Sequence, residues 1–142
     1  MADALLHGME KQVAYAHVCA TIPASLNHDL APELGHFTRV LSGGLHLLPE
    51  SAIESSGYAV HTLEAAIWLL LHYDGFRSTA LAAVNLGSDM DTTTAVVGPL
   101  AALADPHKNE IPTDWLSVLA RREEIKGLAK RFTTQISELG FN

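Results

Sequence analysis

One long apolar segment, from Val60 to Tyr73, most strongly limits the folds that this chain can adopt. Its central residues read Thr-Leu-Glu-Ala-Ala-Ile-Trp-Leu-Leu-Leu, and Glu64 is the one charged side chain among them. A helix that is apolar on every side is buried on every side, because no face of it gains from contact with water. The segment therefore predicts a helix deep in the fold, covered by other elements.

Helical periodicity recurs along the rest of the chain, whereas strand signals are weak. Leu5, Met9 and Val13 repeat at the spacing of an amphipathic helix, which we expect from about residue 3 to 21. We expect Pro23 to close this helix and Pro99 to kink or interrupt a later one. The further helices are expected at about residues 32–42, 60–73, 76–86, 92–104, 112–119 and 122–139. The prediction is an all-α fold in one compact domain, residues 1–142.

The length, charge and hydrophobic pattern of the chain limit the partners that it can bind. A chain of 142 residues can bury roughly two-thirds of its unfolded surface in one core. Nine basic and sixteen acidic residues give a net charge of −7, without a basic patch that would grip nucleic acid. The longest apolar run, Ala65 to Leu71, is far short of the roughly 20 residues that span a bilayer. With no secretory signal at the N-terminus, we expect a soluble cytoplasmic protein that binds neither nucleic acid nor a membrane.

The residues with the strongest chemical signal are 87–94, Gly-Ser-Asp-Met-Asp-Thr-Thr-Thr. They place the carboxylates of Asp89 and Asp91 and the hydroxyl of Thr92 within four positions, between two apolar segments. Crowded carboxylates repel one another unless a cation or hydrogen-bond donors compensate them. Hard oxygen ligands of this kind suit Mg²⁺, Mn²⁺ or Ca²⁺. The octet therefore predicts one flank of a divalent-cation site.

Three other interpretations of the octet are weaker or compatible with metal binding. Asp91 could be the N-cap of a helix that starts near Thr92, which does not exclude a metal. An EF-hand loop beginning at Asp89 fails, since its sixth position is Thr94 and its twelfth is Leu100. The loop also looks superficially like the nucleophile loop of haloacid-dehalogenase-type phosphatases, but that loop follows a strand, and a helical segment precedes this one.

A family resemblance extends over both sides of the octet. It begins at residues 55–68, Ser-Ser-Gly-Tyr-Ala-Val-His-Thr-Leu-Glu-Ala-Ala-Ile-Trp. It continues through residues 82–93, Ala-Ala-Val-Asn-Leu-Gly-Ser-Asp-Met-Asp-Thr-Thr, and ends with Ile-Pro-Thr-Asp-Trp-Leu at 111–116. In order and spacing, roughly residues 55–130 resemble the ADP-ribosylglycohydrolases, the enzymes related to dinitrogenase reductase-activating glycohydrolase, which have some lens crystallins as relatives.

The resemblance implies an all-helical fold with a dinuclear Mg²⁺ or Mn²⁺ centre. That centre binds the ribose of ADP-ribose and assists hydrolysis of its bond to a modified protein side chain. By resemblance, Asp89, Asp91 and Thr92 are metal ligands, and Gly57 and Tyr58 line the ADP-ribose cleft. Judged from the residues alone, Tyr58 either stacks on a ligand or fills the core.

The chain also departs from the family. His61 stands where the family usually has Asp, and Ser88 and Met90 replace the commoner Gly and Thr. Family members are about twice this length, and their N-terminal half brings a Thr-Asp-Asp metal motif that this sequence lacks. We therefore expect the chain to resemble the C-terminal half of the fold, as a natural half-protein or a truncation. His61 and His72 lie on or near the buried helix, and we expect core histidines there in preference to ligands.

Two classes of function follow from this resemblance. One is an ADP-ribosylglycohydrolase that acts on ADP-ribosylated protein only together with its missing half, so that the isolated chain binds metal weakly and does not turn over. A carboxylate of the missing half would then be the catalytic base, and no catalytic residue is assigned in this chain. The alternative is a non-catalytic, crystallin-like binding or assembly module. In either class, apolar surface left exposed predicts self-association, for example as a homodimer.

Overall fold

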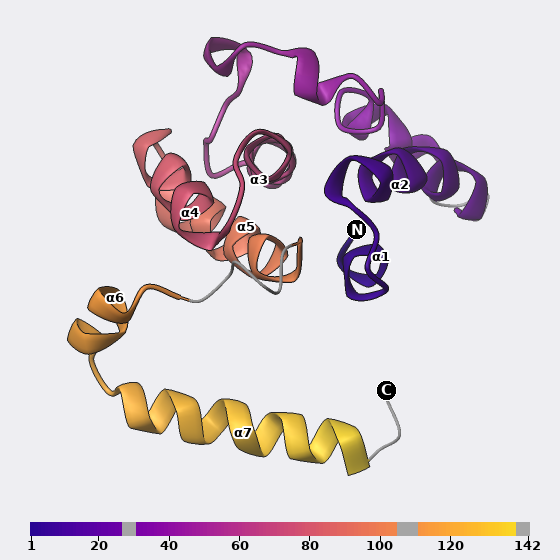
Figure 1. The fold of residues 1–142 in the computed structure, drawn as a ribbon. Coiled ribbons are helices and arrows are strands. Elements are labelled where there is room, and N and C mark those ends of the chain that lie inside the picture. Colours follow the sequence, from indigo (N-terminus) through magenta and orange to yellow (C-terminus); the bar gives the residue numbers. More distant parts are fainter. Residues whose placement is uncertain (27–30, 105–110, 139–142) are drawn as a thin grey trace. The chain divides into compact units, whose positions relative to one another are not determined.

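The computed structural model describes residues 1–26, 31–104 and 111–138. All regular secondary structure in these ranges is helical, which confirms the all-α prediction (Figure 1). The chain forms two compact units, Met1–Glu110 and Ile111–Asn142. Compact units of this kind can belong to one domain, so the single domain over residues 1–142 stays a prediction.

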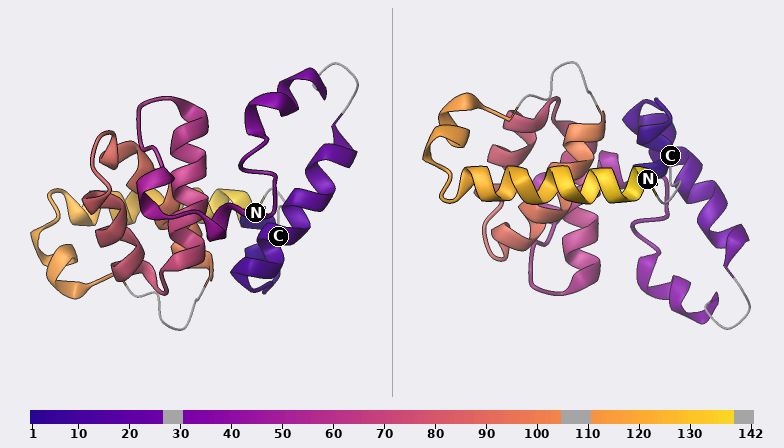
Figure 2. Two further views of the ribbon diagram at one scale, coloured as in Figure 1. Left: turned by 90° about the horizontal axis from the view of Figure 1, so that it is seen from above. Right: turned by 90° about the horizontal axis from the view of Figure 1, so that it is seen from below.

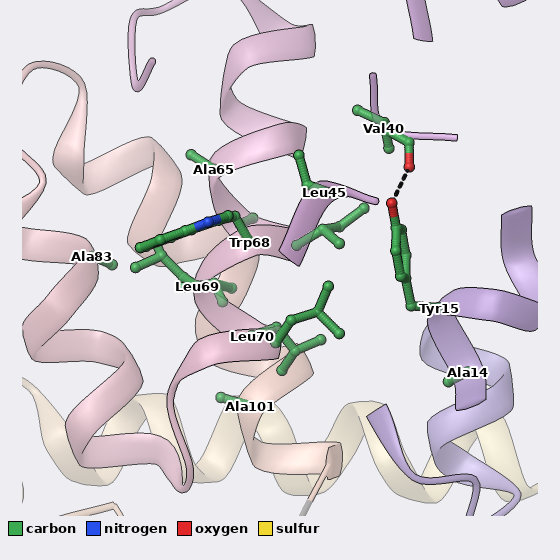
Figure 3. Close-up of a cluster of buried hydrophobic side chains, with 14 of the residues drawn as sticks. Ala14, Tyr15, Val40, Leu45, Ala65, Trp68, Leu69, Leu70, Ala83 and Ala101 are labelled. Carbon is green, nitrogen blue, oxygen red and sulfur yellow. Dashed lines mark hydrogen bonds between the residues drawn. The ribbon is translucent and has the colours of Figure 1, made fainter. Parts of the chain in front are cut away.

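The buried helix expected from the apolar segment is α3, Ala59–His72. It contacts α4, α5 and the short 3₁₀ helix η2 (Leu45–Leu47). Trp68 is 4% exposed, and its indole Nε1 donates to the Leu48 carbonyl at 2.9 Å, ahead of η3 (Glu50–Ala52). Ala65, Trp68, Leu69 and Leu70 of α3 lie in the hydrophobic core (Figure 3). The buried residues of α3 are Thr62, Glu64, Ala65, Ala66, Ile67, Trp68, Leu69, Leu70 and Leu71.

Helices α4 (Phe76–Asn85) and α5 (Met90–Ala104) pack against each other and against α3. Helix α4 lies within one residue of its predicted bounds. Helix α5 begins two residues earlier than predicted and continues through Pro99 as one helix. Pro99 therefore does not interrupt the helix, and a kink there stays a prediction. Asp89 directly precedes α5, and the connection from α4 therefore carries the octet to the start of this helix.

The N-terminal region differs most from the prediction. The single helix expected over residues 3–21 is two helices, α1 (Ala2–Leu6) and α2 (Lys11–Ser25). Gly8 lies between them at φ +80°, a left-handed conformation that ends a right-handed helix. Pro23 lies inside the last turn of α2 and does not close it. The helix expected after Pro32 is a 3₁₀ helix, η1 (Ala31–Phe37).

The second unit contains α6 (Thr113–Val118), which begins one residue after the predicted start at Pro112 and ends one residue before the predicted end, and α7 (Arg122–Glu138). Helix α7 is one uninterrupted helix within a residue of its predicted bounds, as the yellow ribbon of Figure 2 shows. Across both units, no helix in the described ranges combines the length and apolarity that crossing a membrane requires.

Candidate functional site

The candidate site begins at the turn that joins α4 to α5. Gly87 has φ 81° and Ser88 has φ 54°, so two successive residues adopt the left-handed conformation. A non-glycine residue is uncommon there, because its Cβ crowds the backbone. Ser88 therefore occupies a conformation that a glycine would adopt with less strain. The two residues turn the chain sharply and place Asp89 at the N-terminus of α5.

Asp89 and Thr92 are brought together on the first turn of α5. The Thr92 hydroxyl donates to Asp89 Oδ1 at 3.0 Å, and the Thr93 N–H donates to the Asp89 carbonyl at 3.1 Å. Two oxygens on adjacent corners of an octahedral Mg²⁺ shell, with bonds near 2.1 Å, are about 3.0 Å apart. The hydrogen bond thus holds these two side-chain oxygens at a spacing that two adjacent ligands of one cation would also have.

Asp91 lies on the same turn, but its side chain is held less firmly than that of Asp89. Its side chain is exposed, and Oδ1 accepts the N–H of Thr92 at 3.0 Å. Because α5 begins at Met90, the N-cap position belongs to Asp89, and the alternative that made Asp91 the N-cap is wrong. Asp91 occupies the first helical turn, where a carboxylate is favoured by the positive end of the helix dipole.

Residues 55–57 lie directly against this turn. The Asp89 N–H donates to the Ser55 carbonyl at 2.9 Å, and the Ser55 hydroxyl donates to the Gly87 carbonyl at 2.7 Å. A Cβ added to Gly57 would lie 3.4 Å from Asp89 Oδ2. Two of the three segments that carry the family resemblance, about thirty residues apart in sequence, thus form one junction. The role of Ser55 was missed, because a hydroxyl that bridges two backbones is recognisable only once the segments adjoin.

Tyr58 follows this junction as the residue before α3, and it is 51% exposed. Its ring is therefore available to a ligand and does not fill the core. The His61 ring packs edge-on against it, with 5.0 Å between centroids. His61 is half-buried and His72 is exposed, so neither is the core histidine that was expected.

The donor set at this junction is partial. Among residues 1–26, 31–104 and 111–138, no group of three or more His, Cys, Asp or Glu side chains is arranged to hold a metal ion. Asp89 and Thr92 fit a hard divalent cation by oxygen type and spacing, and Asp91 is the carboxylate nearest in sequence. Ligation by Asp89, Asp91 and Thr92, and ligand binding by Gly57 and Tyr58, stay predictions.

Comparison with known proteins decides the family. The sequence model of the family described as ADP-ribosylglycohydrolase matches residues 1–140. The chain belongs to the ADP-ribosylglycohydrolase family. No solved structure matches it.

Three curated relatives are similar to this family member over part of its length. ADP-ribosylarginine hydrolase Tri1 of Serratia proteamaculans (strain 568) is 39% identical over 89 residues, which are 63% of this chain and 24% of that protein. The protein of the same name from Pseudomonas putida (strain GB-1) is 37% identical over 61% of this chain and 24% of its own length. ADP-ribosyl-[dinitrogen reductase] glycohydrolase of Rhodospirillum rubrum is 38% identical over 50% of this chain and 24% of its own. The match thus spans about a quarter of each relative.

Proposed function

We propose that this chain forms one side of a Mg²⁺- or Mn²⁺-dependent site that binds ADP-ribose and takes part in its hydrolytic removal from modified protein side chains. The supporting observation is the junction itself: the Asp89 and Thr92 oxygens lie 3.0 Å apart, and the Gly57 backbone lies beside the same carboxylate. The residues that we propose as metal ligands are thus neighbours of those that we propose to line the ligand, as a ribose bound to the metal would require.

In this proposal Asp89, Asp91 and Thr92 hold the ion, and Gly57 and Tyr58 border the ADP-ribose. A bound divalent ion would supply positive charge that orients ribose hydroxyls and a water molecule. The chain's own contribution is preorganisation: Thr92 and the Ser55 carbonyl hold the side chain and backbone of Asp89 before any ligand arrives. The proposed carboxylates also stabilise the positive charge of an oxocarbenium-like transition state.

The substrate that we propose is ADP-ribosylated arginine on a protein. Two relatives, at 39% and 37% identity, are named ADP-ribosylarginine hydrolase. We further propose that the catalytic base and the remaining metal ligands come from a second polypeptide segment, since the described residues offer no third acidic or histidine ligand. Alone, the chain would bind the ion weakly and turn over no substrate.

A second candidate is a non-catalytic binding or assembly module that forms homodimers. The observation that favours it is exposed apolar surface on two helices of the core. Val84 of α4 is 46% exposed and Val96 of α5 is 37% exposed. Covering apolar surface of this kind with a second copy of the chain lowers the free energy and so favours a dimer.

A metal titration with matched variants tests the first proposal. We expect weak but saturable Mn²⁺ binding by the purified chain, and a loss of affinity of roughly tenfold or more in Asp89→Asn, which keeps the shape and removes the charge. Asp3→Asn is the control, because it removes the same charge from an exposed side chain in α1. Measured release of ADP-ribose from ADP-ribosylarginine should be absent for the chain alone.

Three results would contradict parts of this account. Equal Mn²⁺ affinity in wild type and Asp89→Asn would remove Asp89 from the site. Rapid release of ADP-ribose by the purified chain would show that the site is complete without a second segment. A stable metal-free homodimer that never binds ADP-ribose would favour the assembly module.

A further inference from the structure

His61 contacts Tyr58 directly through its ring and indirectly through Ser56. Its ring meets the Tyr58 ring edge-on, with 5.0 Å between centroids and 88° between planes. Its Nδ1 lies 2.8 Å from the Ser56 hydroxyl oxygen, in hydrogen-bond contact, and that oxygen also accepts the Tyr58 N–H at 3.3 Å. One imidazole therefore restrains the side chain of Tyr58 directly and its backbone through Ser56.

The same imidazole is itself restrained. Nδ1 also lies 3.3 Å from Glu54 Oε2, and His61 occupies the first turn of the buried helix α3. The Thr62 hydroxyl donates to the Ser56 carbonyl at 3.3 Å, which fixes the other end of Ser56. His61 is thus a rigid support, because its helix is anchored in the core.

Tyr58 needs such a support, since half of its surface faces solvent. An exposed ring that is free to change rotamer loses conformational entropy on binding, and a ring already held in place loses less. Gly57, its neighbour, is the residue whose Cβ would lie 3.4 Å from Asp89 Oδ2. Holding Tyr58 therefore fixes an exposed aromatic ring on the residue that follows Gly57.

We propose that His61 is a positioning residue that holds the ring and backbone of Tyr58 in place, and thereby strengthens ADP-ribose binding without touching the ligand. The inference rests on the proposed function for the identity of the ligand, but not for the contact between His61 and Tyr58.

Two variants separate the ring from the hydrogen bond. His61→Asn can keep a bond to Ser56 and removes the ring, whereas His61→Phe keeps a ring and removes the bond. His72→Asn is the matched control, because His72 lies at the far end of the same helix and stacks on Trp68. The readouts are the ¹⁹F resonance of Tyr58 in chain labelled with 3-fluorotyrosine, assigned by its loss in Tyr58→Phe, and calorimetric ADP-ribose affinity in Mg²⁺.

We expect both His61 variants to move the Tyr58 resonance and to weaken ADP-ribose binding by about 2- to 10-fold, the range of an aromatic pair contact. Mn²⁺ affinity should stay within about twofold, and His72→Asn should change nothing. An unmoved Tyr58 resonance in both variants would overturn the inference, as would equal losses of Mn²⁺ and ADP-ribose affinity, which indicate general unfolding. If wild type binds no ADP-ribose while the resonance still moves, the positioning of Tyr58 stands and the proposed function fails.

Discussion

Single residues at the junction differ in how firmly the fold holds them. Asp89 has a neighbour at three of its groups: the Ser55 carbonyl at its N–H, the Thr92 hydroxyl at Oδ1, and the Gly57 backbone near Oδ2. Asp91 is exposed and bonds to the N–H of the next residue. Residue types alone predicted both carboxylates. They could not show that Asp89 is held more firmly than Asp91. That difference comes from residues 55–57, whose contact with Asp89 exists only in the fold.

Substitutions at Gly57 test how large a side chain fits beside the Asp89 carboxylate. An Ala Cβ would meet Asp89 Oδ2 at 3.4 Å, an ordinary van der Waals contact, so Gly57→Ala should change Mn²⁺ affinity by less than about twofold. Gly57→Val adds two further methyl groups next to this carboxylate. We expect them to displace the Asp89 carboxylate and thereby to lower Mn²⁺ affinity roughly tenfold.

The control for this series is Gly35→Val, since a Cβ at Gly35 has nothing within 4 Å. Isothermal titration with Mn²⁺ measures all three variants. Unchanged affinity in Gly57→Val would show that the Gly57 backbone does not limit the position of Asp89.

Whole helices were predictable where one signal covered the entire element. Helices α3 and α7 begin and end within a residue of prediction, because unbroken apolar or charged periodicity runs to a clear stop. The break between α1 and α2 was missed, since Leu5, Met9 and Val13 keep helical spacing across it and only Gly8 marks it. The spacing of apolar residues alone could not predict the turn between α1 and α2.

Tyr15 joins α2 to the segment after η1, and its pH response tests that link. Its hydroxyl donates to the Val40 carbonyl at 2.8 Å (Figure 3), and the side chain is 3% exposed. Burial, followed by the hydrogen bond with Cys19, raises the pKa of Tyr15 above its ordinary value of 10.0. Since the unfolded chain ionises first, the stability from this tyrosine is full below pH 10 and is lost as pH rises through the raised pKa.

Tyr15→Phe should therefore lower the free energy of unfolding by about 1–3 kcal/mol at pH 8, because the Val40 carbonyl then keeps only the weaker Cys19 thiol donor at 3.7 Å. It should also reduce the further loss of stability between pH 8 and 10.5. Urea unfolding at the two pH values measures both effects, with Tyr58→Phe, a change at an exposed ring, as the control. An alkaline loss as large in Tyr15→Phe as in wild type would contradict the assignment.

At the level of the whole molecule, the family model and the curated relatives match different lengths of sequence. The family model covers residues 1–140, while the alignments to curated relatives cover 24% of each of those proteins. The junction between residues 55–58 and 87–92 belongs to the unit Met1–Glu110. The proposed site can therefore be tested in this chain, even though the proposed activity needs a further segment.

Paramagnetic broadening by Mn²⁺ tests the central claim most directly, because it locates the ion. Substoichiometric Mn²⁺ added to the ¹⁵N-labelled chain should first broaden the amide resonances of Gly57, Asp89, Asp91 and Thr92, and Asp89→Asn should abolish this pattern. Broadening centred on Glu123 and Glu124 of α7, or broadening that never saturates at any residue, would contradict a divalent-cation site at the start of α5.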